Sequence, residues 1–312
     1  MKLKRMFICA VAAAVACSCT TKTDSIRINQ VGFYPAQEKT LTLEPENRCR
    51  TVQIYKEGTL VWEGEALREA TSPWSGKVRR IFDFSELTEP GTYTVQAGKE
   101  TKEFVIDENA LDELAEAALT AFYHQRSGMD LDSTIAGQWA RKGGHPDTEV
   151  LIHASAASES RPEGTVISSP KGWYDAGDYN KYVVNSGYSM GLMAEAFLMF
   201  PDVYDRDIYN PLFEELLYNE EWMWTMQDPE DGGVYHKLTT PNFEGFVTPT
   251  ECRQQRYVVQ KSVTAALDFA GALCSMAGLN GMAWIGDDIN AYNICKVRFD
   301  KAEVAYAWAK AH

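Results

Sequence analysis

Residues 172–183 of this 312-residue chain read Gly-Trp-Tyr-Asp-Ala-Gly-Asp-Tyr-Asn-Lys-Tyr-Val. The string places two carboxylates, Asp175 and Asp178, three residues apart among aromatic side chains, with Gly177 directly before the second. Paired acids can hold and deprotonate a water molecule, small residues let a ligand approach the backbone, and flat rings can stack on a sugar. A bare Asp-x-x-Asp is also typical of a solvated turn that begins a helix. The aromatic flanks favour a catalytic loop.

Four other segments accompany this string, and their order along the chain is specific: residues 26–33, 121–128, 231–239 and 257–270. Together they resemble glycoside hydrolase family 9, the cellulase family with an (α/α)6 barrel. The first segment is similar to the opening strand of the immunoglobulin-like module that often precedes such barrels. The resemblance implies an N-terminal all-β immunoglobulin-like sandwich, followed by an all-α (α/α)6 barrel of which this chain holds the N-terminal part.

The N-terminus has the pattern of an export signal over residues 1–19. Basic residues precede an apolar run at 6–16, which is too short to span a bilayer. Small residues then lead to Cys17 and Cys19, and both positions resemble a bacterial lipoprotein cleavage site. We expect an exported chain, with one of these cysteines lipidated and the protein sorted to the outer membrane. An ordinary cleaved secretion signal is the alternative.

The charge and composition narrow the classes of partner. The formal net charge is -14 and the isoelectric point about 4.9. This excess of acidic groups argues against nucleic acid, because Lys and Arg drive binding to a polyanion. A neutral polysaccharide is unaffected by the sign of the charge. The only membrane contact expected is the N-terminal lipid anchor.

The remaining cysteines do not indicate a disulfide framework or a metal site. Cys49, Cys252, Cys274 and Cys295 are scattered singly, without the spacing of metal ligands. Cys274 lies among small residues in a predicted helix, so we expect it to be buried as a small hydrophobic side chain. Pairing of Cys252 with Cys274 or Cys295 stays open for an exported chain.

The periodicity divides the chain near residue 107. Alternating apolar residues predict strands at 50–55, 60–62, 79–84, 91–98 and 102–106, which suit a small sandwich over residues 20–107. Helical spacing begins after that point. We expect the partial catalytic domain at 108–312.

Within this second domain, an irregular stretch at 127–170 separates the first helix from the others. Further helical patterns occur at 182–200, 211–226, 257–277 and 296–311. The family barrel has twelve helices, so the resemblance implies a truncated catalytic domain. A complete smaller helical domain is the competing interpretation.

Inverting cleavage of a glycosidic bond needs one acid for the leaving oxygen and one base for water, roughly 6.5–9.5 Å apart. Asp175 and Asp178 share one short loop, so both carboxylates are expected to bind the same water molecule. The resemblance implies that Asp178 is the general base and that Asp175 orients the water. The family's proton donor is a later glutamate, and no segment here matches its motif. Glu244 and Glu251 are ordinary loop glutamates, so we expect an inactive fragment.

Several other residues are candidates for substrate or metal binding. We expect Trp173, Tyr174 and Tyr179 to stack on sugar or line the groove, and His236 to hydrogen-bond a sugar hydroxyl. One or two of the rings are expected only to pack the loop.

No metal is expected. The resemblance places His145 and Asp147 where many family members hold a metal with the help of a cysteine, which is missing here. Calcium bound by loop carboxylates stays open, although no EF-hand-like string occurs.

These observations predict an exported hydrolase that cleaves β-1,4-glucosidic bonds by inversion in cellulose, mixed-linkage glucan or xyloglucan. A non-catalytic surface lipoprotein that binds carbohydrate is the alternative from another class. An exo-acting relative that acts on oligosaccharides is a third hypothesis.

Overall fold

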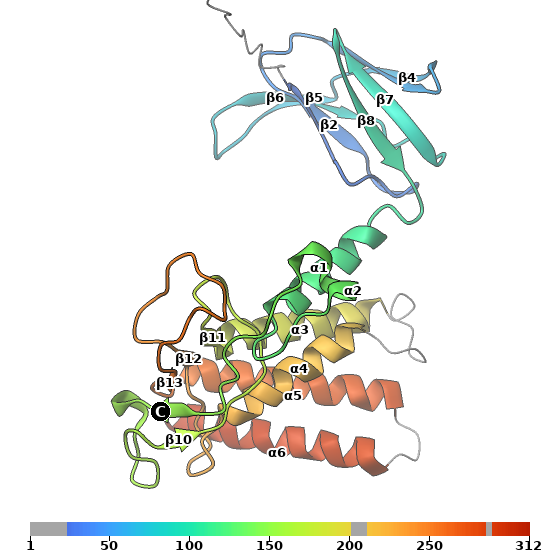
Figure 1. Ribbon diagram of the computed structural model, residues 1–312. Helices are drawn as coiled ribbons and strands as arrows, with labels where there is room; N and C mark the ends of the chain where they lie inside the picture. The colour runs from blue at the N-terminus through green and yellow to red at the C-terminus, as the bar shows by residue number, and fades with distance from the viewer. Residues whose placement is uncertain (1–23, 201–210, 285–288) are drawn as a thin grey trace, which may run out of the picture. The chain divides into compact units, whose positions relative to one another are not determined.

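The structure, a computed structural model, describes residues 24–200, 211–284 and 289–312 of the chain (Figure 1). The chain divides into two compact units between Leu114 and Ala115. The predicted signal at 1–19, with Cys17 and Cys19, lies outside the described residues. Among the described helices, none is long and apolar enough to cross a membrane.

The first unit consists of two antiparallel four-stranded sheets. One has the order β1-β2-β6-β5 and contains β1 (Ile26–Ile28), β2 (Thr40–Leu43), β5 (Arg68–Thr71) and β6 (Val78–Asp83). The other has the order β4-β3-β7-β8 and contains β3 (Thr51–Lys56), β4 (Thr59–Glu65), β7 (Gly91–Ala97) and β8 (Glu100–Ile106).

Alternation along the strands creates the core of this sandwich. Every second residue of β7 is buried, starting at Tyr93, and the rings of Phe33, Phe84 and Phe104 contact one another in the core. Glu57 and Gly58 both have positive φ, as a two-residue hairpin turn requires. The predicted strands are confirmed. β2 and β5 were not predicted, because four residues give little periodic signal.

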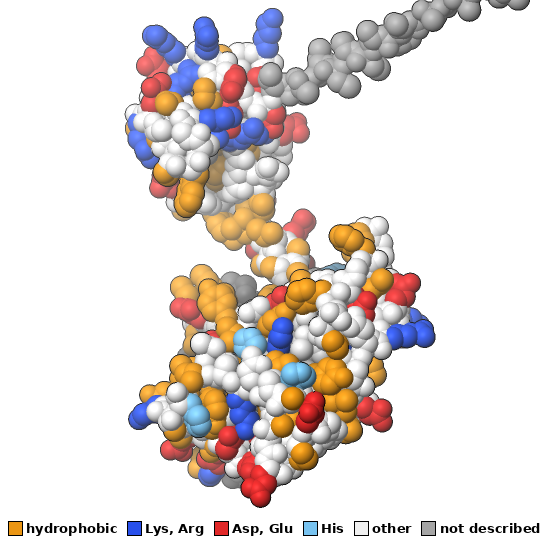
Figure 2. Space-filling model, turned by 90° about the vertical axis from the view of Figure 1, so that its left-hand side faces the viewer, with side chains coloured by type: hydrophobic (Ala, Val, Ile, Leu, Met, Phe, Trp, Pro, Cys, Tyr) orange, Lys and Arg blue, Asp and Glu red, His pale blue; other side chains and the backbone are white. Residues whose placement is uncertain are grey.

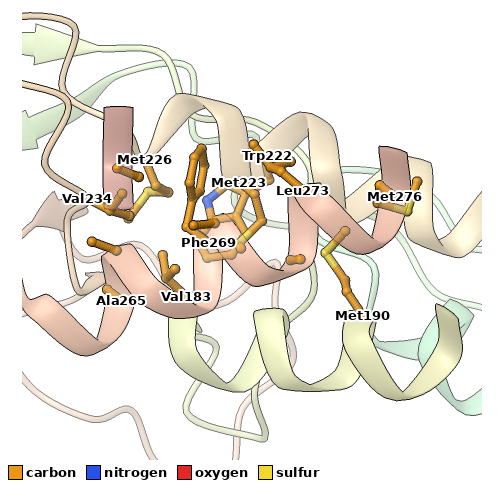
Figure 3. Packing of buried hydrophobic residues seen from close by; sticks show 14 of the residues in the cluster. Val183, Met190, Trp222, Met223, Met226, Val234, Ala265, Phe269, Leu273 and Met276 are labelled. Atoms are coloured by element: carbon orange, nitrogen blue, oxygen red, sulfur yellow. The ribbon is translucent and has the colours of Figure 1, made fainter. Parts of the chain in front are cut away.

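The second unit is mainly helical. Its long helices are α1 (Asp112–Gln125), α3 (Val183–Met199), α4 (Pro211–Thr225), α5 (Val263–Trp284) and α6 (Ile289–Ala311), with a short α2 (Ser133–Ala136). Helix α5 packs against α3, α4 and α6. Figure 3 shows Trp222 and Met223 of α4 packed with Phe269 and Leu273 of α5 and with Val183 of α3.

Two helix starts differ from the predictions. Helix α5 begins at Val263 and not at Tyr257, because the Ser262 hydroxyl accepts a hydrogen bond from the Ala265 amide and caps the helix there. Tyr257 instead lies in a short strand. Helix α6 begins at Ile289, seven residues before the predicted start at Lys296.

The helical unit also contains a five-stranded sheet that was not predicted. It has the order β10-β9-β13-β12-β11 and contains β9 (Val150–Ile152), β10 (Val166–Ile167), β11 (Lys181–Tyr182), β12 (Lys237–Thr239) and β13 (Tyr257–Val258). The expectation of an irregular stretch at 127–170 is therefore wrong for β9 and β10. Strands of two or three residues carry no readable period, and distant segments complete them. Pairing of β11 with β12 brings the end of the 172–183 string beside His236.

The cysteine predictions are partly wrong. Cys274 is exposed and not buried, because it lines an open pocket between α5 and α6. Cys49, Cys252, Cys274 and Cys295 are all free, so neither pairing considered for Cys252 forms.

Candidate active site

The loop at residues 172–181 follows β10 and leads into β11, and backbone bonds to the end of α1 and the residues after it fix its first end. The Tyr174 amide donates to the Gln125 carbonyl at 2.8 Å, and the Ser127 amide donates to the Gly172 carbonyl at 2.9 Å. Gly172 has a φ of 81°, and a Cβ there would lie 2.6 Å from the Trp222 ring. Glycine is therefore required where the loop leaves the core.

Asp178 is partly buried and accepts several hydrogen bonds. Its Oδ1 accepts from the Asn180 amide at 3.2 Å, and its Oδ2 accepts from the Asn180 side chain and the Tyr182 hydroxyl, both at 3.1 Å. Burial raises the pKa of Tyr182, which keeps its hydroxyl protonated as a donor. These bonds orient the Asp178 carboxylate.

Asp175 is exposed, and its hydrogen-bond partners differ from those of Asp178. Its amide donates to the Asn180 carbonyl at 2.9 Å, which closes the turn that carries both aspartates. Its Oδ1 accepts from the side chain of Asn185 in the first turns of α3. The two carboxylates thus share one turn, but different elements orient them.

Trp173 and Tyr174 are buried, with 4% and 3% of their surface exposed. The Trp173 indole donates to Glu215 Oε2 at 3.1 Å, and the Tyr174 hydroxyl donates to the Gly144 carbonyl at 2.9 Å. Burial raises the pKa of Tyr174 to about 12, so this donor stays protonated. Both side chains border a pocket, but their burial means that they mainly hold the loop in place.

The pocket has a volume of about 120 Å³ and reaches from the loop to one face of α3. Its walls combine aromatic side chains with amides, hydroxyls and a carboxylate: Phe122, Gln125, Trp173, Tyr174, Asp175, Tyr182, Asn185, Ser186 and Ser189. Such a mixture suits a hydroxyl-rich neutral ligand, since rings cover its apolar faces and polar groups bind its hydroxyls.

Tyr179 and His236 lie farther along the same region, and both are half-buried. The Tyr179 hydroxyl donates to the Val247 carbonyl, and its ring lies 5.7 Å from that of His145. The His236 ring meets Tyr182 edge-on at 6.3 Å, and burial lowers the pKa of His236, which favours the neutral imidazole. Tyr182 therefore contacts both Asp178 and His236.

The surroundings of His145 and Asp147 do not suit a metal ion. His145 Nδ1 lies 2.8 Å from the Tyr174 hydroxyl, and burial, followed by the nearby Arg256 charge, lowers its pKa to about 4. The Asp147 carboxylate already pairs with Lys181 at 2.8 Å and with Arg256 at 3.1 Å. Among the described residues, no three His, Cys, Asp or Glu side chains gather as metal ligands.

Three polar residues of the site were not predicted from the sequence: Asn180, Tyr182 and Asn185. A signal for part of this set was present, because residues 182, 185, 186 and 189 follow helical spacing and place polar groups on one face of α3. Figure 2 shows a face of the helical unit on which histidine side chains lie among hydrophobic, uncharged and a few charged groups.

Comparison with known proteins gives two matches that together cover most of the chain. Residues 112–312 match glycosyl hydrolase family 9, and residues 21–102 match the cellulase N-terminal ig-like domain.

Among curated relatives, a xyloglucan-specific endo-beta-1,4-glucanase of Bacteroides ovatus is 49% identical over 96% of this chain and 52% of its own length. Endoglucanase D of Acetivibrio thermocellus is 34% identical over 81% of this chain and 41% of its own length.

Solved structures agree with these matches. A Bacteroides ovatus GH9 structure superposes with a TM-score of 0.84 at 49% identity, covering 93% of this chain and 54% of that one. AaCel9A in complex with cellobiose-like isofagomine gives a TM-score of 0.78 at 28% identity, covering 92% and 52%.

The chain thus spans about half the length of the relatives it matches. The expected fold, a sandwich followed by part of an (α/α)6 barrel, is confirmed. The chain belongs to glycosyl hydrolase family 9 and carries the immunoglobulin-like domain of cellulases at its N-terminus.

Proposed function

We propose that this chain forms the water-activating part of an inverting endo-β-1,4-glucanase. The observation that carries the proposal is the loop at 172–181, where Asp175 and Asp178 share one turn beside a pocket with aromatic and polar walls. In this role Asp178 is the general base, oriented by Asn180 and Tyr182. Asp175, exposed beside the pocket, orients the attacking water.

Inversion also needs a proton donor on the opposite face of the sugar. We place that acid in the part of the relatives' length that this chain does not span. The chain by itself should then bind a glucan without cleaving it. The non-catalytic alternative makes the same prediction for the chain alone, so only a completed barrel separates the two hypotheses.

Xyloglucan, or a related β-1,4-glucan, is the proposed substrate. The 49% identity to a xyloglucan-specific enzyme supports this assignment, as does a pocket whose walls hold a single ionisable carboxylate, Asp175. A neutral polysaccharide also agrees with the acidic chain, which would repel a polyanion.

The test uses a chimera of residues 20–312 with the remaining part of the Bacteroides ovatus relative. We expect Asp178→Ala to lower kcat on xyloglucan by roughly 10²–10⁴, the range for general-base catalysis, with little change in KM. Asp130→Ala is a matched control, because this exposed carboxylate binds exposed Lys142 and the neighbouring Gly143 amide and does not border the pocket.

Two further readouts test the assignment of the base. Azide should partly restore turnover of the Asp178 variant, and proton NMR of the fresh product should show the inverted anomer. Near-parental turnover in Asp178→Ala would show that the loop is only a turn. An active parent chimera that cleaves carboxymethylcellulose but not xyloglucan would reject the substrate and keep the mechanism.

We also propose that the protein is exported and anchored to the outer membrane by lipid on Cys17 or Cys19. The support is the pattern of the first nineteen residues. Cells that express the chain should incorporate labelled palmitate, and replacing both cysteines with Ala should abolish the label. Label that survives the double replacement would refute the anchor.

A further inference from the structure

Lys181 is fully buried, and its ammonium group uses all three of its hydrogens. Its Nζ donates to the Ser169 carbonyl at 3.0 Å and to the Lys171 carbonyl at 2.7 Å, and lies 2.8 Å from Asp147 Oδ2. The Trp222 ring, 5.3 Å away, covers the same group. A buried lysine side chain is rare unless every donor is satisfied, as it is here.

These bonds connect the two ends of the loop that carries the aspartates. Ser169 and Lys171 precede the loop, whereas Lys181 is the first residue of β11. A side chain at the exit of the loop therefore holds the backbone at its entrance. Closing a loop in this way limits the conformations of the residues between its ends.

The backbone at the entrance has an unusual conformation that this contact supports. Lys171 and Gly172 have φ angles of 64° and 81°, and the left-handed region is unfavourable for a residue with a side chain. In this conformation the Lys171 carbonyl faces the Lys181 ammonium group. Without the ammonium group, this partly buried carbonyl would lose its partner and Lys171 could return to an ordinary conformation.

Asp147 fixes the ammonium group relative to the rest of the unit. Its carboxylate is fully buried and also binds Arg256, the residue directly before β13, while its main-chain carbonyl accepts the Ser169 amide at 2.8 Å. The carboxylate thus joins the loop base to the small sheet. Lys181 itself does not line the pocket beside the loop, and none of its side chain is exposed.

We propose that Lys181 is a positioning residue. It holds the two ends of the 172–181 loop together and thereby keeps Asp175 and Asp178 in their observed geometry. Describing this as catalytic positioning rests on the function proposed above. The restraint that Lys181 places on the loop ends is independent of that function. Its test therefore measures the exchange of loop amides in the 312-residue chain and not turnover.

The test is hydrogen–deuterium exchange of peptides covering residues 172–180, where the Tyr174 and Asp175 amides are bonded. We expect Lys181→Met to increase exchange there by at least tenfold. Asp147→Asn should destabilise the whole unit more, because it leaves two buried cations without a carboxylate, yet it should loosen the loop less. Lys261→Met removes a mostly buried lysine that pairs with Asp228 and Asp231 outside the loop, and is the matched control.

A purely structural role predicts a different pattern, in which loop exchange follows the loss of global stability across all three variants. That pattern, or a change of less than twofold in Lys181→Met, would overturn the proposal. Should Lys181→Met fail to fold, exchange of the parent chain in low urea still decides. The amides of residues 169, 174, 175 and 181 should then exchange with the same free energy of opening. If the loop amides open independently of the other two, the proposed restraint by Lys181 is refuted.

Discussion

In the described part of the chain, each unit buries one lysine completely, and the two lysines have different hydrogen-bond partners. In the sandwich, Lys39 donates to the carbonyls of Pro35 and Gln37 at 2.7 and 2.8 Å and to that of Ser85 at 3.4 Å, and it has no ion pair among the described residues. In the helical unit, Lys181 donates to two carbonyls and also pairs with Asp147. Main-chain carbonyls alone can therefore accept the hydrogen bonds of a buried ammonium group. The Asp147 carboxylate must have another effect on the structure.

The carboxylate connects segments that are far apart in the sequence. The two shorter bonds of Lys39 close a turn of at most four residues, and its longer bond reaches Ser85, whereas Lys181 joins its loop to Asp147 and, through Asp147, to Arg256. A turn needs only local closure. For the function proposed above, the loop with its two aspartates benefits from attachment to a rigid sheet, since small displacements of reacting groups are costly for catalysis.

The largest expected effect comes from removing the carboxylate that distinguishes the two sites. Asp147→Asn leaves the charges of Lys181 and Arg256 buried without a counterion, so we expect a loss of about 3–5 kcal/mol in the free energy of unfolding. Urea unfolding followed by circular dichroism measures this loss. A loss below about 1 kcal/mol would show that the carbonyls alone support the ammonium group, as they do for Lys39.

The second largest expected effect is a difference between the two units in how their stability depends on pH, because all five histidines lie in the helical unit. His145 is 7% exposed, and its pKa of about 4 lies below the ordinary 6.5. Between pH 4 and pH 6.5, His145 is protonated in the unfolded chain and neutral in the folded chain. Stability of the helical unit should therefore fall by up to about 3 kcal/mol as the pH decreases from 6.5 to 4.

His145→Gln provides the comparison for that prediction, since glutamine does not titrate. The variant should show a shallower dependence of its urea midpoint on pH between 6.5 and 4 than the parent chain. An identical slope in both proteins would mean that His145 is not held neutral by the fold.

The smallest effect is expected for the lysine of the sandwich. Lys39→Met should cost about 1–2 kcal/mol, because the carbonyls of Pro35 and Gln37 lie close enough to the surface to bind water instead. Thermal unfolding of the variant, compared with Lys99→Met at an exposed position, measures the difference. A cost equal to that of Asp147→Asn would remove the proposed distinction between the two buried lysines.

Much of the fold was predictable because local patterns specify it. Alternation predicted β3, β6, β7 and β8, and helical spacing predicted all the long helices of the second unit, although α5 and α6 begin elsewhere. The small sheet was not predictable, since its strands are two or three residues long and gain stability only by pairing. Its consequence for the site is the approach of His236 to Tyr182.

The sequence by itself determined the chemical identity of the site: two aspartates among aromatic residues, in an order of motifs that belongs to one family. Tertiary structure alone decided how those groups are held. Burial makes Trp173 and Tyr174 supports for the loop, and Asn180, Tyr182 and Asn185 orient the two carboxylates.

The physical reason is the range of the interactions. Propensity and periodicity act over a few neighbouring residues, so a sequence pattern carries them directly. The contact between Lys181, Asp147 and Arg256 joins residues up to 109 positions apart, and its strength depends on the exclusion of water by the folded core. No local pattern encodes that exclusion.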